Sequence, residues 1–430
     1  MNNLIYDIHD KPKSWKGWIL YPLQMLMAVF VATVLIASIC GTPIDVCLLG
    51  GCIGTLIYQL CTRFKSPMFI SNSGATVSAV IGALALGTTP NYLAVAIGGC
   101  VIAVVYGLFA ILVKYRGIAA FNKIFPATIV GPVTVVIGLN LAKFIPTYAQ
   151  VGGADSSIGV CVAILVAIVV AVVSHYAKGF WKTIPFLVGL VVGYIVCLIL
   201  EGVGAANFGI INTLSTVDGF FRLPSFTFLE WGNNQVGWSE FRDILLLFVP
   251  VSICALLEHY SDHKVLSNII GRDLTEDPGL HRTLIGDGLA SMMGTWVCGL
   301  PNTSYGESVA TIGFSRVASV VVTTVSAIVM GCLAFIGPFQ VFLESIPSCV
   351  FGGCAIILYG YIACSGLKTI INNKIDLENN KNLIVVSSIL TVGVSGLFLF
   401  SSSFAGVSLA MVVGVLLNLL LGIKTHKGEN

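Results

Sequence analysis

Charged residues are scarce in this chain of 430 residues: they make up 10% of it, whereas 56% of the residues are hydrophobic. A chain of this composition cannot cover itself with polar surface in water, which excludes an ordinary water-soluble protein. A long basic tail is also missing, and the net charge is only +2. We therefore expect an integral protein of the lipid bilayer that does not bind nucleic acid.

Motifs of common enzymes and metal proteins are absent as well. The sequence contains neither H-E-x-x-H nor G-x-S-x-G, and its thirteen cysteines form no C-x-x-C pair. His259 and His263 have the i, i+4 spacing of a metal-binding pair, but no third distant ligand is evident. We expect no enzyme, no cofactor and no metal site. A channel is disfavoured too, because polar residues gather in two short segments instead of along a repeated polar face.

Long apolar runs recur along the chain, for example at 160–173, 186–200 and 318–336. They approach the roughly 20 residues that cross a bilayer as a helix, and they lack the alternation of membrane strands. We predict an all-α polytopic membrane protein with about fourteen transmembrane segments, near 18–38, 43–62, 68–86, 93–113, 126–145, 158–177, 183–201, 243–262, 281–299, 301–316, 317–337, 345–365, 382–400 and 404–423.

The distribution of basic residues orients these segments. If the N-terminus is cytoplasmic, every Lys and Arg falls in an inner loop except Lys143, Arg222 and Arg242. Basic residues accumulate on the cytoplasmic side, so both termini are predicted to be cytoplasmic. The first apolar run is too long for a signal peptide and has no cleavage site of small residues, so we expect no removed signal peptide.

A faint internal repeat lies at about half the chain length. Phe125–Gly131 is similar to Ile346–Gly352, and Gly74–Ser78 is similar to Gly306–Ala310. Seven segments per half is an odd number, which forces the halves into opposite orientations, as in many secondary transporters. The predicted organisation is a first inverted repeat at 1–201, an outer loop at 202–242 that forms a lid or an interface, and a second inverted repeat at 243–430.

Two segments interrupt the apolar pattern. Ser71–Thr76 and Pro301–Gly306 are small, polar and rich in helix-breaking residues, which disfavours a continuous helix there. We predict a short strand leading into a half helix in each, in segments 3 and 10, with backbone N–H groups near Gly74 and Gly306 facing a shared cavity. Ordinary loops between helices are the alternative.

Two acids occur where lipid disfavours them, Glu258 at the end of an apolar run and Glu307 beside the second interruption. An ionisable side chain in a membrane segment costs roughly 3 kcal/mol, so it normally faces a polar cavity, a partner or a substrate path. The alternative for Glu258 is a helix-end ion pair with Lys264. Asp287, inside another apolar run, fits a bracing and a functional role equally well.

Several motifs in series carry a resemblance to a known family. Glu258-His259, Asn268, Asp273, Asp277–Arg282 and Pro301–Glu307 resemble the nucleobase-ascorbate transporter family, in particular its bacterial uracil permease branch, over about residues 20–422. The resemblance implies a seven-plus-seven inverted repeat with a core domain that holds substrate and a gate domain that pairs two subunits into a homodimer. It also implies proton symport in the cytoplasmic membrane.

The family's substrate-binding residues map onto five positions of this chain. Its two carboxylates fall on Glu258 and Glu307, its main-chain contacts fall on Gly74 and Gly306, and Tyr305 is adjacent. An aromatic residue that relatives carry at the position of Gly74 is missing here.

A second departure concerns the proton path. The histidine that the family often carries four residues after Glu258 is replaced by Asp262, and His263 follows one position later, about 100° around the helix. Glu258, Glu307, Asp262 and His263 are therefore the candidates for proton coupling.

The chemistry of uracil fits these residues. Carboxylates can accept hydrogen bonds from its N–H groups, and backbone N–H groups can donate to its carbonyl groups. Two close carboxylates raise each other's proton affinity, which links proton entry to substrate entry. We expect proton-coupled import of uracil. The alternatives are a xanthine, uric acid or other purine permease, and an anion carrier of the related sulfate-transporter fold, which two acids at the site disfavour.

Overall fold

The computed structural model describes residues 4–124, 126–150, 156–399 and 401–423. Phe125, the first residue of one predicted repeat, and the basic residues Lys424 and Lys427 lie outside these ranges. The described chain is mostly helical, and seven of its helices are long and apolar enough to cross a membrane. The protein is thus a multi-pass membrane protein. These seven helices lie in α1 (Trp15–Cys40), α2 (Ile44–Cys61), α4 (Tyr92–Ile124), α5 with α6 (Ala127–Ala142 and Ile145–Ala149), α7 (Ser156–Tyr176), α8 (Pro185–Gly202) and α15 (Ser348–Asn372).

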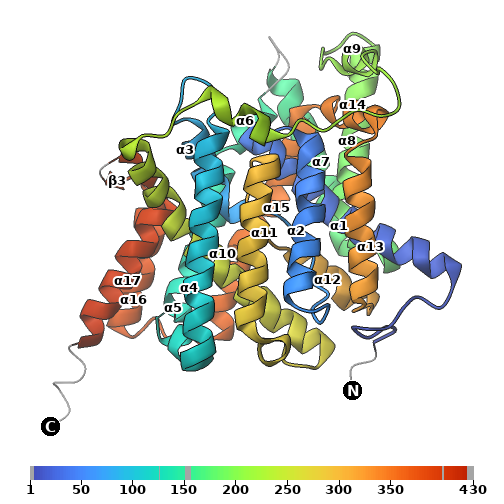
Figure 1. Ribbon diagram of the computed structural model, residues 1–430. Coiled ribbons are helices and arrows are strands. Elements are labelled where there is room, and N and C mark those ends of the chain that lie inside the picture. The colour runs from blue at the N-terminus through green and yellow to red at the C-terminus, as the bar shows by residue number, and fades with distance from the viewer. Residues whose placement is uncertain (1–3, 125, 151–155, 400, 424–430) are drawn as a thin grey trace.

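The helices form two groups, and each group draws on both halves of the sequence. In the first group, α4, α11 (Leu280–Cys298), α2 and α13 (Val320–Leu333) stand side by side across the front of the molecule, with α1 and α10 (Trp238–Ile270) packed against this row (Figure 1). In the second group, α15 packs on α5, α7 and α8, while α16 (Asn380–Val394) and α17 (Val407–Ile423) pack on each other and on α5. The groups meet where α10 contacts α17 and α5, and where α1 contacts α8.

Two short strands lie within the first group and contact α1, α2, α10 and α11. β1 (Ile70–Asn72) and β2 (Asn302–Ser304) pair antiparallel, so that Asn72 lies opposite Asn302, and we call this pair the strand crossing. The strands predicted in the two interrupted segments are therefore present. Each leads into a short helical segment: β1 into a 3-10 turn (Gly74–Thr76) and α3 (Val77–Leu84), and β2 into α12 (Gly306–Ser315).

Side-chain amides anchor this crossing to the surrounding helices. The Asn302 side chain donates to the Gly50 carbonyl at 2.9 Å and to the Ala290 carbonyl at 3.1 Å. Asn72 donates to the Thr33 carbonyl at 3.1 Å. Buried polar groups are stable only when they are hydrogen-bonded, so these contacts let a strand pair exist inside a helical body.

Close helix packing depends on glycine in α2. A Cβ placed at Gly51 would lie 2.5 Å from the Ser71 hydroxyl oxygen and 2.5 Å from the Met330 methyl carbon. Small residues at such positions allow backbones to approach, which is how helices associate within a bilayer. The crossing strands therefore sit directly against α2.

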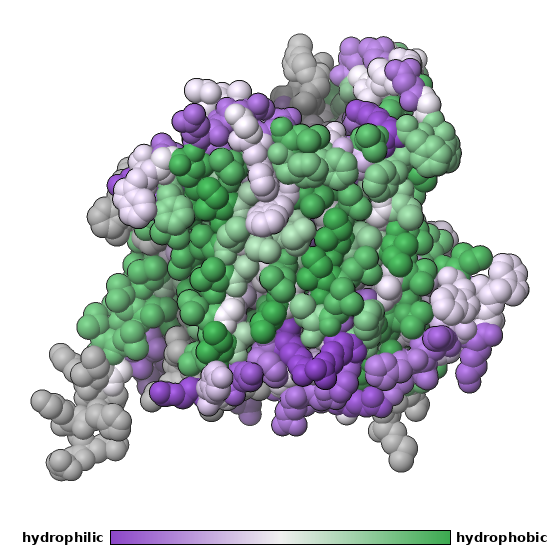
Figure 2. Space-filling view, in the orientation of Figure 1, coloured by the Kyte–Doolittle hydropathy of each residue, from purple (hydrophilic) through white to green (hydrophobic). Residues whose placement is uncertain are grey.

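The polar connections lie at the two ends of the helices. The segment 202–242 contains α9 (Ile210–Leu214) and a 3-10 turn (Thr227–Asn233), and it runs along the upper edge in Figure 1. It is held there by Ser225 N–H, which donates to Asp45 at 2.8 Å, and by the Arg222–Glu344 ion pair at 3.2 Å, which reaches the end of α14 (Gly337–Glu344). An apolar band lies between polar upper and lower edges (Figure 2).

A small hairpin joins α16 to α17. It consists of β3 (Phe398–Leu399) and β4 (Ser401–Ala405), which pair antiparallel. Nothing in the sequence pattern predicted strands at this position, where an apolar run continues to Phe400.

Candidate functional site

A cavity of about 400 Å³ lies where the strand crossing meets α10. Its walls come from both helix groups: the starts of the two short helical segments, α10 and α1 on one side, and α5, α8 and α15 on the other. Pockets of this size that combine apolar walls with a few convergent polar groups are typical ligand sites. The lining residues that were predicted from the sequence are Gly74, Glu258, Asp262, Tyr305, Gly306 and Glu307.

The acids reach the cavity from two elements. Glu258 and Asp262 lie one turn apart on α10, so their side chains share a face of that helix, and Glu307 lies in the first turn of α12. All three side chains are half-buried, as expected for groups that line a cavity. All three line the cavity.

Asp262 and His263 face different surroundings although they are adjacent in sequence. Asp262 Oδ2 accepts a hydrogen bond of 3.1 Å from Ser304 Oγ at the edge of the cavity. His263 is fully buried on a different face of α10, where its Nε2 lies 2.6 Å from the hydroxyl oxygen of Tyr58 on α2. The structure thus brings three of the four proton-coupling candidates to the cavity, and it leaves His263 away from it.

The N-termini of the two short helical segments open onto the same space. Neither the 3-10 turn that begins at Gly74 nor α12, which begins at Gly306, has a side-chain cap. The first N–H groups of a helix have no intrahelical acceptor, so they are available to a ligand, and the helix end carries a partial positive charge. The cavity therefore presents backbone donors opposite carboxylate acceptors.

A buried cluster supports β2 from behind. His259 Nδ1 lies 2.7 Å from Asp287 Oδ2, and both side chains are completely buried. Thr303 of β2 donates a hydrogen bond of 3.4 Å to the same carboxylate oxygen. Asp287 does not line the cavity, but it contacts Thr303, which does.

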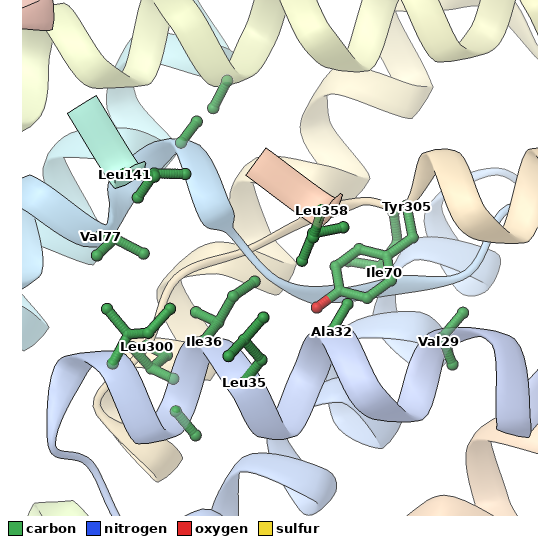
Figure 3. Packing of buried hydrophobic residues seen from close by; sticks show 14 of the residues in the cluster. Val29, Ala32, Leu35, Ile36, Ile70, Val77, Leu141, Leu300, Tyr305 and Leu358 are labelled. Carbon is green, nitrogen blue, oxygen red and sulfur yellow. The ribbon is translucent and has the colours of Figure 1, made fainter. Parts of the chain in front are cut away.

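Sequence reasoning missed the wall formed by α1. Ala28, Ala32 and Ile36 line the cavity, and the ring of Tyr305 lies against this part of α1 (Figure 3). The Tyr305 hydroxyl oxygen is 3.4 Å from Thr33 Oγ1, and the residue is only 4% exposed. The i, i+4, i+8 spacing of these three residues was a detectable signal, but small residues are common on membrane helices.

The far end of the cavity was also not predicted. Lys182 and Phe314 line it, with the Lys182 ammonium nitrogen 5.2 Å from the centre of the Phe314 ring. Lys182 belongs to the connection between α7 and α8, which the basic-residue pattern assigns to the cytoplasmic side.

Comparison with protein families identifies the class of the molecule. The model of a group described as "Permease family" matches residues 16–402. The chain belongs to this permease family. The permease is 35% identical to the uracil permease of Bacillus caldolyticus (100% of this chain and 98% of that protein) and 35% identical to that of Bacillus subtilis strain 168 (96% and 94%). It is 32% identical to the uracil permease of Escherichia coli K12 (93% and 90%). It is a transporter and not an enzyme.

Solved structures of other transporters share the fold. The transmembrane domain of a cyanobacterium bicarbonate transporter, BicA, superposes with a TM-score of 0.61 at 15% identity, covering 96% of this chain and 99% of that one. SLC26A9 superposes with a TM-score of 0.69 at 10% identity, covering 96% of this chain and 66% of that one. At these identities the likeness concerns the fold alone.

Proposed function

We propose that this permease imports a nucleobase, with uracil as the principal substrate, by proton symport across the cytoplasmic membrane. One observation carries the proposal: Glu258, Glu307 and the uncapped segment starts at Gly74 and Gly306 all face one cavity. The full-length similarity to uracil permeases of several bacteria supports it.

The donor and acceptor pattern of the cavity suits a neutral ring with alternating N–H and C=O groups. Glu258 and Glu307 accept from the ring N–H groups, while backbone N–H groups at Gly306 and Gly74 donate to the ring carbonyls. Tyr305 forms part of the wall between these groups. Charge-assisted hydrogen bonds are about twice as strong as neutral ones, which favours the acid that stays charged in the loaded site as the main anchor.

Proton coupling follows from placing a neutral ligand against acids. A charged carboxylate in a water-poor cavity costs more free energy than a neutral one, so loading the site favours uptake of a proton. We assign this role to Glu258 or Glu307, with Asp262 as the group that passes the proton toward the cytoplasm. His263 is a less suitable carrier, because its ring points away from the cavity and contacts Tyr58 of α2.

Alternating access would move the two helix groups against each other. We propose that α1–α4 and α10–α13 form the core and that α5–α8 and α15–α17 form the gate and the homodimer contact, in a seven-plus-seven inverted repeat with cytoplasmic termini. The antiparallel pairing of β1 with β2 supports an inverted arrangement. The cavity reaches Lys182 of a predicted inner loop, so we assign this conformation to the inward-facing state.

An anion carrier is the second candidate, because the structural neighbours include bicarbonate and anion transporters. Three acids but a single basic residue, Lys182, are present among the described lining residues. An anionic substrate would add negative charge next to these acids, which disfavours this function.

Uptake of radiolabelled uracil tests the proposal. The permease is expressed in cells that lack their own nucleobase carriers, and uptake is measured at two external pH values with unlabelled uracil, xanthine and bicarbonate as competitors. We expect uptake that rises at acid pH and is blocked by uracil but not by xanthine or bicarbonate. Inhibition by xanthine would assign a purine substrate. Equal uracil uptake at the two pH values would refute proton coupling.

A further inference from the structure

Gly74 is a glycine that neither the backbone nor the packing requires. It is absent from the glycines with positive φ, so an L side chain could be accommodated at its backbone angles. A Cβ placed on it would meet only Ile36 Cδ1 at 3.8 Å and Ile362 Cδ1 at 4.0 Å, which are ordinary contact distances. Gly51 of α2 differs, because a Cβ there would lie 2.5 Å from Ser71 Oγ. Because Gly74 has no side chain, space remains beside it inside the cavity.

This space has apolar walls, in contrast to the opposite end of the binding region. Ile36 of α1 and Ile362 of α15 border it, and Leu358 lies one turn before Ile362 on the same helix. A Cβ on Gly306 would instead meet Asp262 Oδ1 at 3.7 Å. The two segment starts therefore face unlike surroundings: acids near Gly306, and aliphatic side chains near Gly74.

A pyrimidinedione ring is likewise divided into a polar part and an apolar part. Its N–H and C=O groups occupy one continuous part of the ring, and the remaining edge, C5–C6, carries only C–H groups. If the acids bind the ring N–H groups and the Gly74 N–H donates to the C4 carbonyl, the neighbouring C5–H lies next to Gly74, on the aliphatic side of the cavity. A small apolar group on C5 would then fill space that no protein atom occupies.

We propose that the space beside Gly74 is an apolar subsite that accepts a small alkyl substituent at C5 of the pyrimidine, such as the methyl group of thymine. Gly74 is then a specificity-determining residue, because a side chain at this position would compete with the substituent for the same volume. This inference rests on the proposed function and narrows it to a class of substrates, uracil together with 5-alkylpyrimidines.

Competition for radiolabelled uracil uptake tests the inference, with unlabelled uracil and thymine as competitors. In the unaltered permease, we expect thymine to inhibit with a half-maximal concentration within about tenfold of that of uracil, since one methyl group alters discrimination by this order. In Gly74→Val, we expect inhibition by thymine to weaken at least about tenfold relative to inhibition by uracil. Gly74→Ala, with a smaller side chain, should fall between the two.

Gly107→Val is the matched control. Gly107 lies within α4 and does not line the cavity, and a Cβ placed on it would meet no atom within 4 Å. Its ratio of thymine to uracil inhibition should therefore stay unchanged. Amounts of each variant in the membrane are measured by immunoblot, and the ratio of the two competitors is independent of these amounts.

Three results would overturn the inference. Uracil uptake that thymine does not inhibit would show that the subsite does not accept the methyl group. Equal weakening of both competitors in Gly74→Val and Gly74→Ala would show that the position affects the whole base. A complete lack of uracil uptake by the unaltered permease, present in the membrane, would refute the proposed function and this inference with it.

Discussion

Ser304 Oγ donates a hydrogen bond of 3.1 Å to Asp262 Oδ2, and this contact joins strand β2 to the face of α10 that also carries Glu258. The crossing strands and the acid-bearing helix are therefore coupled at the cavity itself. A change in the charge of Asp262 would alter its hydrogen bond to Ser304 and so affect β2. It would also affect the start of α12, which begins two residues after Ser304.

Replacing Asp262 tests its role in the proton path. Asp262→Asn keeps the shape and can still accept from Ser304, but it cannot bind a proton. We expect uracil uptake to fall at least about tenfold and its enhancement at acid pH to be lost, as measured in the two-pH uptake assay. Ser304→Ala is the control, because it removes the hydrogen bond and leaves the acid, so its pH dependence should remain. Wild-type uptake and pH response in Asp262→Asn would contradict the assignment.

The two proposed anchor acids should differ from exposed acids in their effect on binding. Glu258→Gln and Glu307→Gln should differ. Uracil binding should weaken by about 10- to 100-fold for the acid that stays charged in the loaded site, since a hydrogen bond to a charged group contributes about 1.5–3 kcal/mol, and by less for the acid that takes up the proton. Ligand-induced thermal stabilisation of the purified permease measures this. Glu276→Gln, in an exposed connection, should bind uracil normally. Equal affinity in all three variants would remove the acids from the site.

The strand crossing should depend on Asn302. Asn302→Ala deletes the donors to the Gly50 and Ala290 carbonyls and leaves these buried acceptors without that partner. We expect a loss of about 1–3 kcal/mol in the free energy of unfolding, visible as a lower midpoint in thermal unfolding in detergent. Asn233→Ala, at an exposed position in the segment 202–242, should leave the midpoint nearly unchanged. A midpoint for Asn302→Ala that matches this control would show that the crossing does not need the amide.

The amino-terminal segment should restrain the end of α12. Ile5 N–H donates to the Arg316 carbonyl at 2.8 Å, and Ala318 N–H donates to the Tyr6 carbonyl at 2.9 Å. Deleting residues 1–10 removes these main-chain bonds, and we expect faster hydrogen exchange at 315–320. Asp7→Asn is the matched control. It breaks only the exposed ion pair with Arg272, which is worth about 0–1 kcal/mol, so exchange there should change little. Unchanged exchange after the deletion would refute the restraint.

Much of the architecture was predictable because it depends on local composition. Apolar runs with few charges predicted a helical membrane protein, and the polar breaks at Ser71–Thr76 and Pro301–Gly306 predicted short strands there. The acids Glu258 and Glu307 were conspicuous because ionisable residues are costly in lipid. Each of these signals is contained within about 20 neighbouring residues.

The remaining features arise from contacts between distant parts of the chain. Two features depend on packing that no local pattern encodes: the pairing of Asn72 with Asn302 and the cavity wall formed by α1. The choice between Asp262 and His263 depends on the rotation of α10, because a step of one residue turns a side chain by about 100°. The sequence by itself therefore determined that the chain is a helical membrane protein and which of its residues are costly in lipid. Only the tertiary structure decided which of them share the cavity, because the packing of the helices sets the direction in which each side chain points.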